Sequence, residues 1–239
     1  MRNNKLQLPT VTLMCVDCVN VERAIAVVEH CKTMCDFGAV KLLTSLSTDY
    51  SHIKIPALNS LVEYSIWMLT KCYKYIDTDY VLIIQRDGWI LNPDTWENDW
   101  LKYDYIAPLF NQYDIVGSGG FSIRSKRLMQ GVARLTPHWN YTTENANEIQ
   151  NLLGFYEDGV ISFNEELKAK YNYAPVDVAN KFAQGGNPNM DNYCKRPFGF
   201  HGSYRTINHN TGEVDVPSDS FDPKLTDRLN ELIELYVKK

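Results

Sequence analysis

The hydrophobic pattern is dominated by an unbroken apolar run at residues 81–84 (VLII), which is followed at once by the polar residues 85–88 (QRDG). A run of strand length that is rich in β-branched residues predicts a central strand buried on both faces. Ligands of open α/β sheets bind beyond the carboxyl ends of the strands, so Gln85, Asp87 and Gly88 are expected where a substrate would be held. Two interpretations of Asp87 follow: a ligand of a divalent cation, or a turn residue that accepts backbone hydrogen bonds.

Apolar runs and helical stripes alternate along the rest of the chain. Strands are predicted at residues 9–18, 39–43, 103–108, 116–125 and 174–179. Helices are predicted at 20–35 with Asn20 as its cap, at 56–69, from 92 to about 100, at 126–135, from 157 to about 171, and as an amphipathic C-terminal helix over about 222–238. The first strand, helix and second strand form one βαβ unit, and the alternation predicts an α/β fold.

Composition limits the possible functions. With 24 Lys and Arg against 29 Asp and Glu, the net charge of -5 argues against a nucleic-acid-binding surface, which needs a basic stripe. No apolar run is long enough to cross a bilayer and no signal-type segment follows the N-terminus, so a cytoplasmic protein of one domain is expected. The six cysteines fit reduced thiols. The zinc-like spacing of Cys15, Cys18, Cys31 and Cys35 is opposed by the helix predicted between the two pairs.

Three further features carry candidate chemistry. The glycines of residues 117–120 (GSGG) interrupt a strand pattern, which usually marks the close approach of a ligand or another backbone. Glu157 and Asp158 open a predicted helix, where carboxylates either interact favourably with the helix dipole or act as a general base. His201 lies between aromatic and glycine residues and is either a buried core histidine or a metal ligand.

Five motifs, in this order along the chain, resemble those of a known family: residues 85–93 (QRDGWILNP), 103–106 (YDYI), 119–125 (GGFSIRS), 157–158 (ED) and 198–202 (FGFHG). The family is a set of glycosyltransferase-like proteins, long classed as a domain of unknown function, whose fold is similar to the GT-A type. The resemblance covers roughly residues 8–205. It implies a single GT-A-like (Rossmann-like) domain with a mixed central sheet flanked by helices. It also implies a transferase that moves a sugar from a nucleotide-sugar donor to a glycan or another hydroxyl acceptor.

The resemblance also implies roles for the matching positions. Asp87 and His201 would bind a metal, Mn²⁺ or Mg²⁺, although Gln85 replaces the first residue of the usual Asp-x-Asp and so weakens that site. Of the acidic pair, Asp158 ahead of Glu157 would take the proton of the acceptor hydroxyl, which gives direct displacement with inversion.

The donor would be held by residues at the ligand edge of the predicted sheet. The turn after the first strand is placed to hold the base and ribose, and the strand after the glycines would flank the donor sugar. These donor-binding candidates are Val16, Asp17, Asn20, Arg23, Gln85, Arg86, Gly119 and Gly120. Arg86, Arg196 and Arg205 are candidate partners of the donor phosphates.

Two other functions are weighed against this one. Gln85 and the single Asp87 fit a non-catalytic nucleotide- or glycan-binding module that keeps the fold with a degenerate metal site. A sugar-phosphate nucleotidyltransferase would need a glycine-rich basic loop directly after the first strand, and residues 17–20 (DCVN) provide none.

Overall fold

The structure is a computed structural model that describes residues 5–110, 115–135, 156–185 and 194–202, with a few residues towards the C-terminus (207–208, 211, 213–214, 231–232 and 234). Its strands are β1 (Leu6–Val16), β2 (Cys35–Thr44), β3 (Ile53–Lys54), β4 (Tyr80–Ile84), β5 (Tyr105–Ile106), β6 (Leu109–Phe110), β7 (Ile115–Val116), β8 (Phe121–Ser125), β9 (Ala183–Gly185), β10 (Gly199–His201), β11 (Ile207–Asn208) and β12 (Glu213–Val214). Its helices are α1 (Val21–Met34), α2 (Leu61–Thr70), α3 (Lys126–Leu135), α5 (Glu157–Phe163), α6 (Glu165–Lys170) and α7 (Val176–Phe182), with the 3₁₀ helices η1 (Cys72–Tyr75), η2 (Pro93–Thr95) and η3 (Asn98–Lys102).

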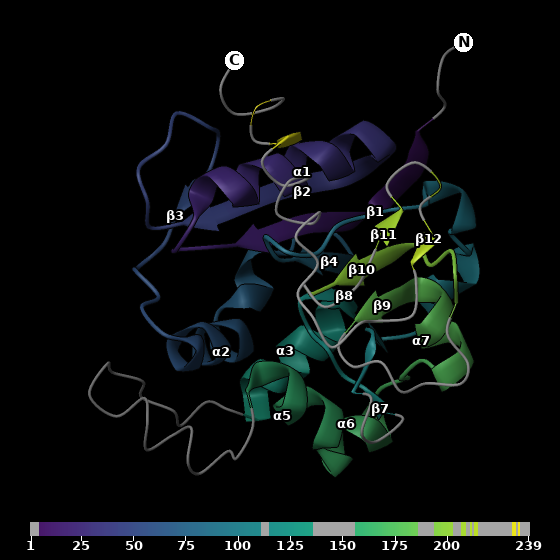
Figure 1. The fold of residues 1–239 in the computed structure, drawn as a ribbon. Coiled ribbons are helices and arrows are strands. Elements are labelled where there is room, and N and C mark those ends of the chain that lie inside the picture. Colours follow the sequence, from purple (N-terminus) through teal and green to yellow (C-terminus); the bar gives the residue numbers. More distant parts are fainter. Residues whose placement is uncertain are drawn as a thin grey trace.

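Six of these strands form a central sheet in the order β3-β2-β1-β4-β8-β5 (Figure 1). The strands β3, β2, β1 and β4 run parallel, whereas β8 is antiparallel to its neighbours β4 and β5. Helix α1 covers one face of the sheet, and α2 and α3 pack on the other. The predicted α/β fold with a mixed central sheet flanked by helices is therefore confirmed, and β4 lies in the interior of the sheet as predicted.

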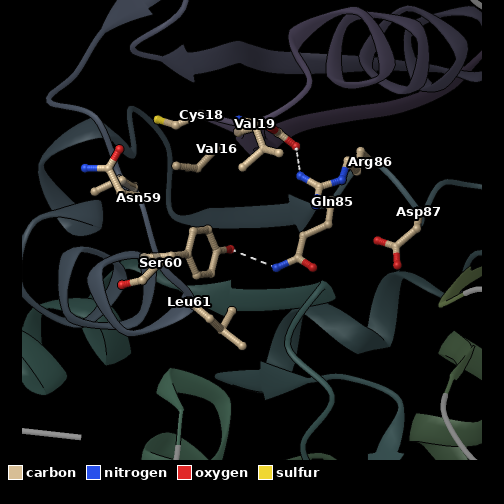
Figure 2. A pocket seen from close by; sticks show the side chains of 12 residues that line it. Val16, Cys18, Val19, Asn59, Ser60, Leu61, Gln85, Arg86 and Asp87 are labelled. Atoms are coloured by element: carbon tan, nitrogen blue, oxygen red, sulfur yellow. Dashed lines mark hydrogen bonds and ion pairs between the residues drawn. The ribbon is translucent and has the colours of Figure 1, made fainter. Parts of the chain in front are cut away.

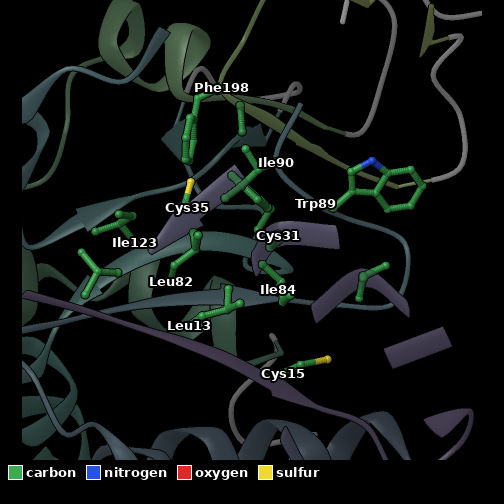
Figure 3. Packing of buried hydrophobic residues seen from close by; sticks show 14 of the residues in the cluster. Leu13, Cys15, Cys31, Cys35, Leu82, Ile84, Trp89, Ile90, Ile123 and Phe198 are labelled. Carbon is green, nitrogen blue, oxygen red and sulfur yellow. The ribbon is translucent and has the colours of Figure 1, made fainter. Parts of the chain in front are cut away.

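Strand β4 is buried on both faces, because successive side chains of a strand point to opposite sides. Leu82 and Ile84 pack in the cluster beneath α1, part of which is drawn in Figure 3. Val81 and Ile83 pack in the second cluster, with α2 and α3. All four side chains are fully buried. A slip of one residue would exchange the two sets, so the pattern fixes the register of β4 and the position of the polar residues that follow it.

Side-chain caps determine where the first two helices begin. Asn20 caps α1 as predicted, since its Oδ1 accepts a hydrogen bond from the backbone N–H of Arg23 at 3.1 Å. The second helix begins at Leu61 and not at residue 56. Ser60 Oγ accepts from the N–H of Glu63 at 3.1 Å, and the buried Glu63 carboxylate accepts from the N–H of Asn59 at 2.8 Å. This variant of a capping box holds residues 56–60 outside the helix.

Two predicted elements in the second half of the chain are wrong. The helix expected from 157 to about 171 is divided into α5 and α6, because Asn164 leaves the helical conformation and its Oδ1 caps α6 by accepting from the N–H of Leu167 at 2.9 Å. The strand expected at 174–179 is helix α7, which follows Pro175. Proline at a helix start loses no intrahelical hydrogen bond and its φ angle suits the helix, which outweighs the strand-like composition.

Three smaller differences complete the comparison. The strand expected at 116–125 is divided into β7 and β8, which belong to different sheets. The short helix expected from residue 92 forms two 3₁₀ helices, η2 and η3. Trp100 of η3 packs edge to face on Trp96, Phe182 and Phe198. The C-terminal helix expected over about 222–238 lies outside the described residues, apart from three helical positions. None of the helices within the described ranges has the length and apolar character needed to span a membrane.

Candidate functional site

A cavity of about 320 Å³ opens beyond the carboxyl ends of β1 and β4 (Figure 2). The chain leaves β1 towards β2 on one side of the sheet and later returns to β4 on the other side. A crevice forms at such a switch point because the connections leave in opposite directions. The lining residues are Val16, Asp17, Cys18, Val19, Leu58, Asn59, Ser60, Leu61, Tyr64, Gln85, Arg86 and Asp87.

The cavity has an apolar end and a charged end. Residues 16–19 and 58–61 provide most of the apolar lining, and the side chains of Val19 and Leu61 are unusually exposed for their type, at 69% and 52%. The charged end consists of Arg86, its partner Asp17 and Asp87, beside Gln85 at the end of β4. An organic ligand with one flat apolar part and one ionic part would match this division.

Backbone contacts bring His201 to the end of β4. The N–H of Gly202 donates to the carbonyl of Asp87 at 3.0 Å, and the N–H of Phe200 donates to the carbonyl of Trp89 at 3.3 Å. A Cβ atom on Gly88 would lie 2.8 Å from the Phe200 carbonyl oxygen. Gly88 is therefore needed for the approach of β10, and the backbone that comes close to it belongs to the protein.

His201 forms a polar cluster with two side chains from the end of β4. Its Nε2 lies 3.4 Å from Asp87 Oδ1 and 3.2 Å from Gln85 Oε1. Its Nδ1 lies 3.1 Å from Ser118 Oγ. Gln85 is oriented from the other side, because its Nε2 donates to the hydroxyl of Tyr64 at 3.1 Å. The amide oxygen of Gln85 therefore faces His201 and Asp87.

The two ionisable groups of this cluster shift each other's pKa. Burial disfavours the imidazolium, but the hydrogen bond and charge of Asp87 outweigh burial, so the pKa of His201 is raised above its ordinary value. Burial also disfavours the carboxylate of Asp87, yet the hydrogen bond and charge of His201 lower its pKa below the usual range. Asp87 is accordingly ionised at neutral pH, with a side chain 38% exposed.

The donor set of the cluster is compatible with Mn²⁺ or Mg²⁺. One carboxylate, one imidazole and one amide oxygen are ligands that such cations accept. Neighbouring ligands of an octahedral cation with bonds of about 2.1 Å lie about 3 Å apart, close to the two separations from His201 Nε2. Within the described ranges no three His, Cys, Asp or Glu side chains group as a metal site. A cation here would need further oxygen ligands from a bound phosphate or water.

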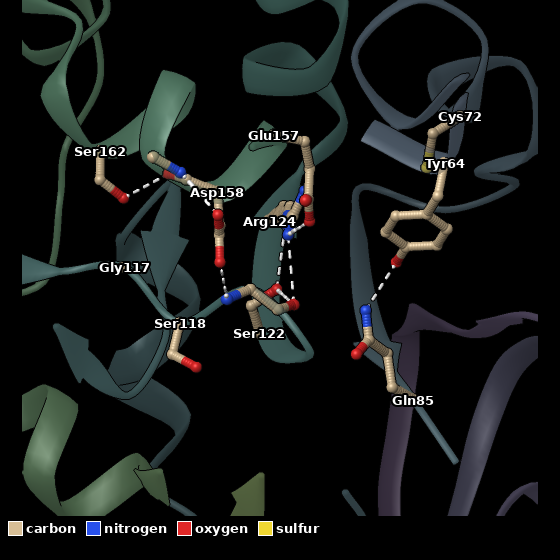
Figure 4. A network of polar contacts seen from close by, with 12 residues as sticks. Tyr64, Cys72, Gln85, Gly117, Ser118, Ser122, Arg124, Glu157, Asp158 and Ser162 are labelled. Atoms are coloured by element: carbon tan, nitrogen blue, oxygen red, sulfur yellow. Dashed lines mark hydrogen bonds and ion pairs between the residues drawn. The ribbon is translucent and has the colours of Figure 1, made fainter. Parts of the chain in front are cut away.

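The turn at residues 118–120 connects this cluster to α5 (Figure 4). The N–H of Gly119 donates to Asp158 Oδ2 at 3.2 Å. A Cβ atom on Gly119 would lie 2.8 Å from the Cβ of Asp158, and one on Gly120 would lie 2.1 Å from His201 Nε2. The two glycines thus let α5 and His201 pack closely on one turn, and their close neighbours are protein side chains.

Glu157 and Asp158 have different environments. Glu157 is buried and its Oε1 accepts from Arg124 Nη2 at 3.2 Å. Arg124 is fully buried, and its Nη2 also donates to the Gly119 carbonyl at 3.2 Å. Burial, and then the charge of Asp158, raise the pKa of Glu157, while Arg124 opposes this shift. Asp158 is partly exposed, and its Oδ1 accepts from the N–H of Gly159 at 2.8 Å, so it is the member of the pair with access to solvent.

The remaining predicted residues are not all brought to the cavity. Asn20 and Arg23 do not line it, and Asn20 serves as a helix cap. Arg196 Nη2 donates to Asn92 Oδ1 at 3.1 Å and to Asp94 Oδ2 at 3.3 Å. These contacts occupy the guanidinium that was expected to bind phosphate. Arg205 lies outside the described residues.

Sequence reasoning missed several residues of the site. Residues 58–61 and Tyr64 line the cavity, and Ser118 and Arg124 hold the parts of the site together. The Ser60-x-x-Glu63 pattern was a usable signal for residues 58–61, because a capping box marks where the loop ends and the helix begins. Arg124 had only one local signal, a charge inside a strand pattern.

The sheet order, and a cavity at the β1–β4 switch point, define a protein with the GT-A glycosyltransferase fold. The galactosyltransferase LgtC, solved in complex with donor and acceptor sugar analogs, matches 95% of this chain and 96% of its own, with 11% identity and a TM-score of 0.54. A glycosyltransferase involved in the glycosylation of the major capsid of PBCV-1 matches 81% of this chain and 94% of its own, with 12% identity and a TM-score of 0.47. At 11% identity the likeness to LgtC concerns the fold alone.

The chain itself belongs to the family described as a protein of unknown function (DUF5672), whose sequence profile matches residues 47–201. Comparison with curated proteins finds no significant match.

Proposed function

We propose that this protein is a cytoplasmic glycosyltransferase that moves a sugar from a nucleotide-sugar donor to a hydroxyl group of a glycan or another acceptor. One observation carries the proposal. The cavity at the β1–β4 switch point ends at Asp87, which contacts His201, and the turn that packs against His201 also holds the carboxylate Asp158. The cavity and the cation-compatible cluster share Gln85 and Asp87, and the general-base candidate lies outside the cavity lining, at the turn that packs against His201.

In this proposal the nucleoside occupies the apolar end of the cavity and the diphosphate points to Asp87. Asp87 and His201 would hold Mn²⁺ or Mg²⁺, with the amide oxygen of Gln85 beside them. When bound, such a cation neutralises the negative charge that develops on the leaving diphosphate. Ser118 keeps the His201 ring in place through Nδ1, as is usual for the partner of a metal-binding imidazole.

Asp158 acts as the general base in the proposed reaction. It takes the proton of the acceptor hydroxyl while the hydroxyl oxygen bonds to the anomeric carbon and the bond to the diphosphate oxygen breaks. Glu157 is bound to Arg124 and does not take part directly. A single displacement inverts the configuration of the sugar, so a product with retained configuration would contradict this mechanism.

A second candidate function is a non-catalytic nucleotide- or glycan-binding module. The observation that favours it is the weak metal site, in which Asp87 and His201 are joined by a neutral Gln85 and not by a second carboxylate. Such a module would bind nucleotide but would show no donor hydrolysis or transfer.

Calorimetric titration with UDP, GDP and CDP, each with and without Mn²⁺, tests the proposed donor site. We expect Mn²⁺ to raise the affinity for one of these nucleotides by about 5–150-fold, because protein and phosphate oxygens would share the cation. Asp87→Ala should remove the Mn²⁺ effect, whereas the control Asp177→Ala, at an exposed position on α7, should keep it. If none of the three nucleotides binds the folded protein, the assignment of the cavity is wrong.

We also expect the Mn²⁺-dependent part of binding to strengthen as the pH rises from about 6 to about 8. Protonated imidazole cannot bind a cation, and the pKa of His201 is raised above its ordinary value of about 6.5. Asp87, whose pKa is lowered, stays ionised over this range and adds no pH dependence. Titrations of His201→Gln at the same pH values should show a clearly weaker trend, because only the terminal phosphate of the nucleotide then titrates in this range. An unchanged trend in that variant would exclude His201 as the group that titrates.

A further inference from the structure

An ion pair between Asp17 and Arg86 bridges the ends of β1 and β4 at the cavity. Arg86 Nη1 donates to Asp17 Oδ2 at 2.8 Å. The other oxygen of Asp17 accepts from the backbone N–H groups of Val19 and Asn20, each at 2.7 Å. The carboxylate thus has three donors and is only 4% exposed, so it is fixed by protein groups.

Arg86, in contrast, keeps most of its hydrogen-bonding capacity. Its side chain is 39% exposed and lines the cavity, and Asp17 is its one hydrogen-bond partner among the described residues. A guanidinium group has five N–H donors in a rigid planar fork, and only one is engaged here. One edge of the group is therefore anchored, and the other donors can bind an anion in the cavity.

The charges that line the cavity support this use of Arg86. The charged lining residues are Asp17, Arg86 and Asp87, and the ion pair cancels the first two. Gln85 contributes no charge where an Asp-x-Asp sequence would contribute a second free carboxylate. Phosphate oxygens that approach Asp87 need a positive partner, and Arg86 is the cationic side chain of the lining, with a fork suited to bidentate phosphate binding.

We infer that Arg86 binds a phosphate group of the nucleotide directly and that Asp17 is the positioning residue that holds it there. Nucleotide binding then has a component that needs no metal. The inference rests on the proposed function, since it takes the cavity as the nucleotide site. It changes the role expected for Asp17 from the sequence, because this carboxylate would orient Arg86 and would not contact the base or ribose.

The substitution Asp17→Asn separates this inference from simple charge effects. Removal of a negative charge near an anionic ligand relieves Coulomb repulsion and would, by that effect alone, strengthen binding. If Asp17 positions Arg86, binding weakens instead. Asparagine can still accept from the N–H groups of Val19 and Asn20, so the turn is kept. The asparagine side chain then has no negatively charged oxygen left to accept a hydrogen bond from the guanidinium of Arg86.

The experiment is calorimetric titration in EDTA with UDP, GDP, CDP and inorganic pyrophosphate. We expect Arg86→Gln to weaken metal-free nucleotide binding by about 10–100-fold, the usual effect of losing hydrogen bonds to a charged group. Asp17→Asn should weaken it by about fivefold or more, but should not weaken it further in the Arg86→Gln background, because there the carboxylate has no guanidinium to position. Two control variants should bind nucleotide as the parent protein does. Glu22→Gln removes an exposed carboxylate from the first turn of α1, and Arg134→Gln removes an exposed guanidinium from α3.

The possible failures are distinguishable. If a nucleotide binds only with Mn²⁺ and Arg86→Gln leaves that binding unchanged, the inference is wrong while the proposed function stands. If Asp17→Asn strengthens binding, or weakens it equally in the Arg86→Gln background, Asp17 does not act through Arg86. If no nucleotide binds with or without Mn²⁺, both the inference and the proposed donor site are wrong.

Discussion

We expect Asp158→Asn to lower the turnover of sugar transfer by about 10²–10⁴-fold, the usual contribution of a general base. The side chain of asparagine cannot take the acceptor proton, but its amide oxygen can still accept the hydrogen bond from the N–H of Gly119. The turn against His201 should therefore keep its geometry, and the affinity for the donor nucleotide should stay within about twofold of the parent value. Steady-state transfer or donor hydrolysis, measured beside calorimetric nucleotide binding, tests both expectations.

A matched control is available in Asp177→Asn, which changes an exposed carboxylate in the first turn of α7 and should leave turnover unchanged. Retention of turnover by Asp158→Asn would exclude Asp158 as the base. Absence of any hydrolysis or transfer in the parent protein, together with nucleotide binding, would favour the binding-module alternative. Turnover and nucleotide affinity, measured on the same protein, therefore separate the two proposed functions.

The centre of the fold was predictable because its signals are local. The run at residues 81–84 is apolar and β-branched, and burial on both faces of a sheet selects for that composition. Asn20 was recognisable as a cap from its place before a helical stripe, and Ser125 likewise precedes α3 and accepts from the N–H of Leu128 at 3.1 Å. The position of the ligand edge then follows from the rule for open α/β sheets.

The internal organisation of the site was less predictable, because it depends on contacts between distant segments. Only the family resemblance implied that His201 lies near Asp87, and no local pattern shows that Asp17 is paired with Arg86. The glycines of the 118–120 turn were recognised as a close-approach site, but the approaching groups belong to α5 and β10. The roles of Glu157 and Asp158 separate only when burial is known, since the sequence presents two equivalent carboxylates.

The buried pair of Arg124 and Glu157 should make the second large difference. We expect Arg124→Met to lower the free energy of unfolding by about 3–5 kcal/mol, because Glu157 would be left charged and buried without its partner. Urea unfolding followed by circular dichroism measures this change. The control Arg134→Met, at an exposed position on α3, should change the free energy by no more than about 0.5 kcal/mol.

Two further measurements identify the unpaired carboxylate as the cause. The pKa of Glu157 is already raised by burial, and loss of Arg124 should raise it further. The folded variant then binds a proton more tightly than the unfolded chain, so its deficit in stability should shrink as the pH falls from about 7 to about 5.

Arg124 Nη1 has no hydrogen-bond partner among the described residues, which adds to the cost of burying this pair. The double variant Arg124→Met with Glu157→Gln should therefore recover much of the lost stability, because it removes both buried charges. A deficit that is equal at both pH values and persists in the double variant would instead assign the loss to packing around the arginine.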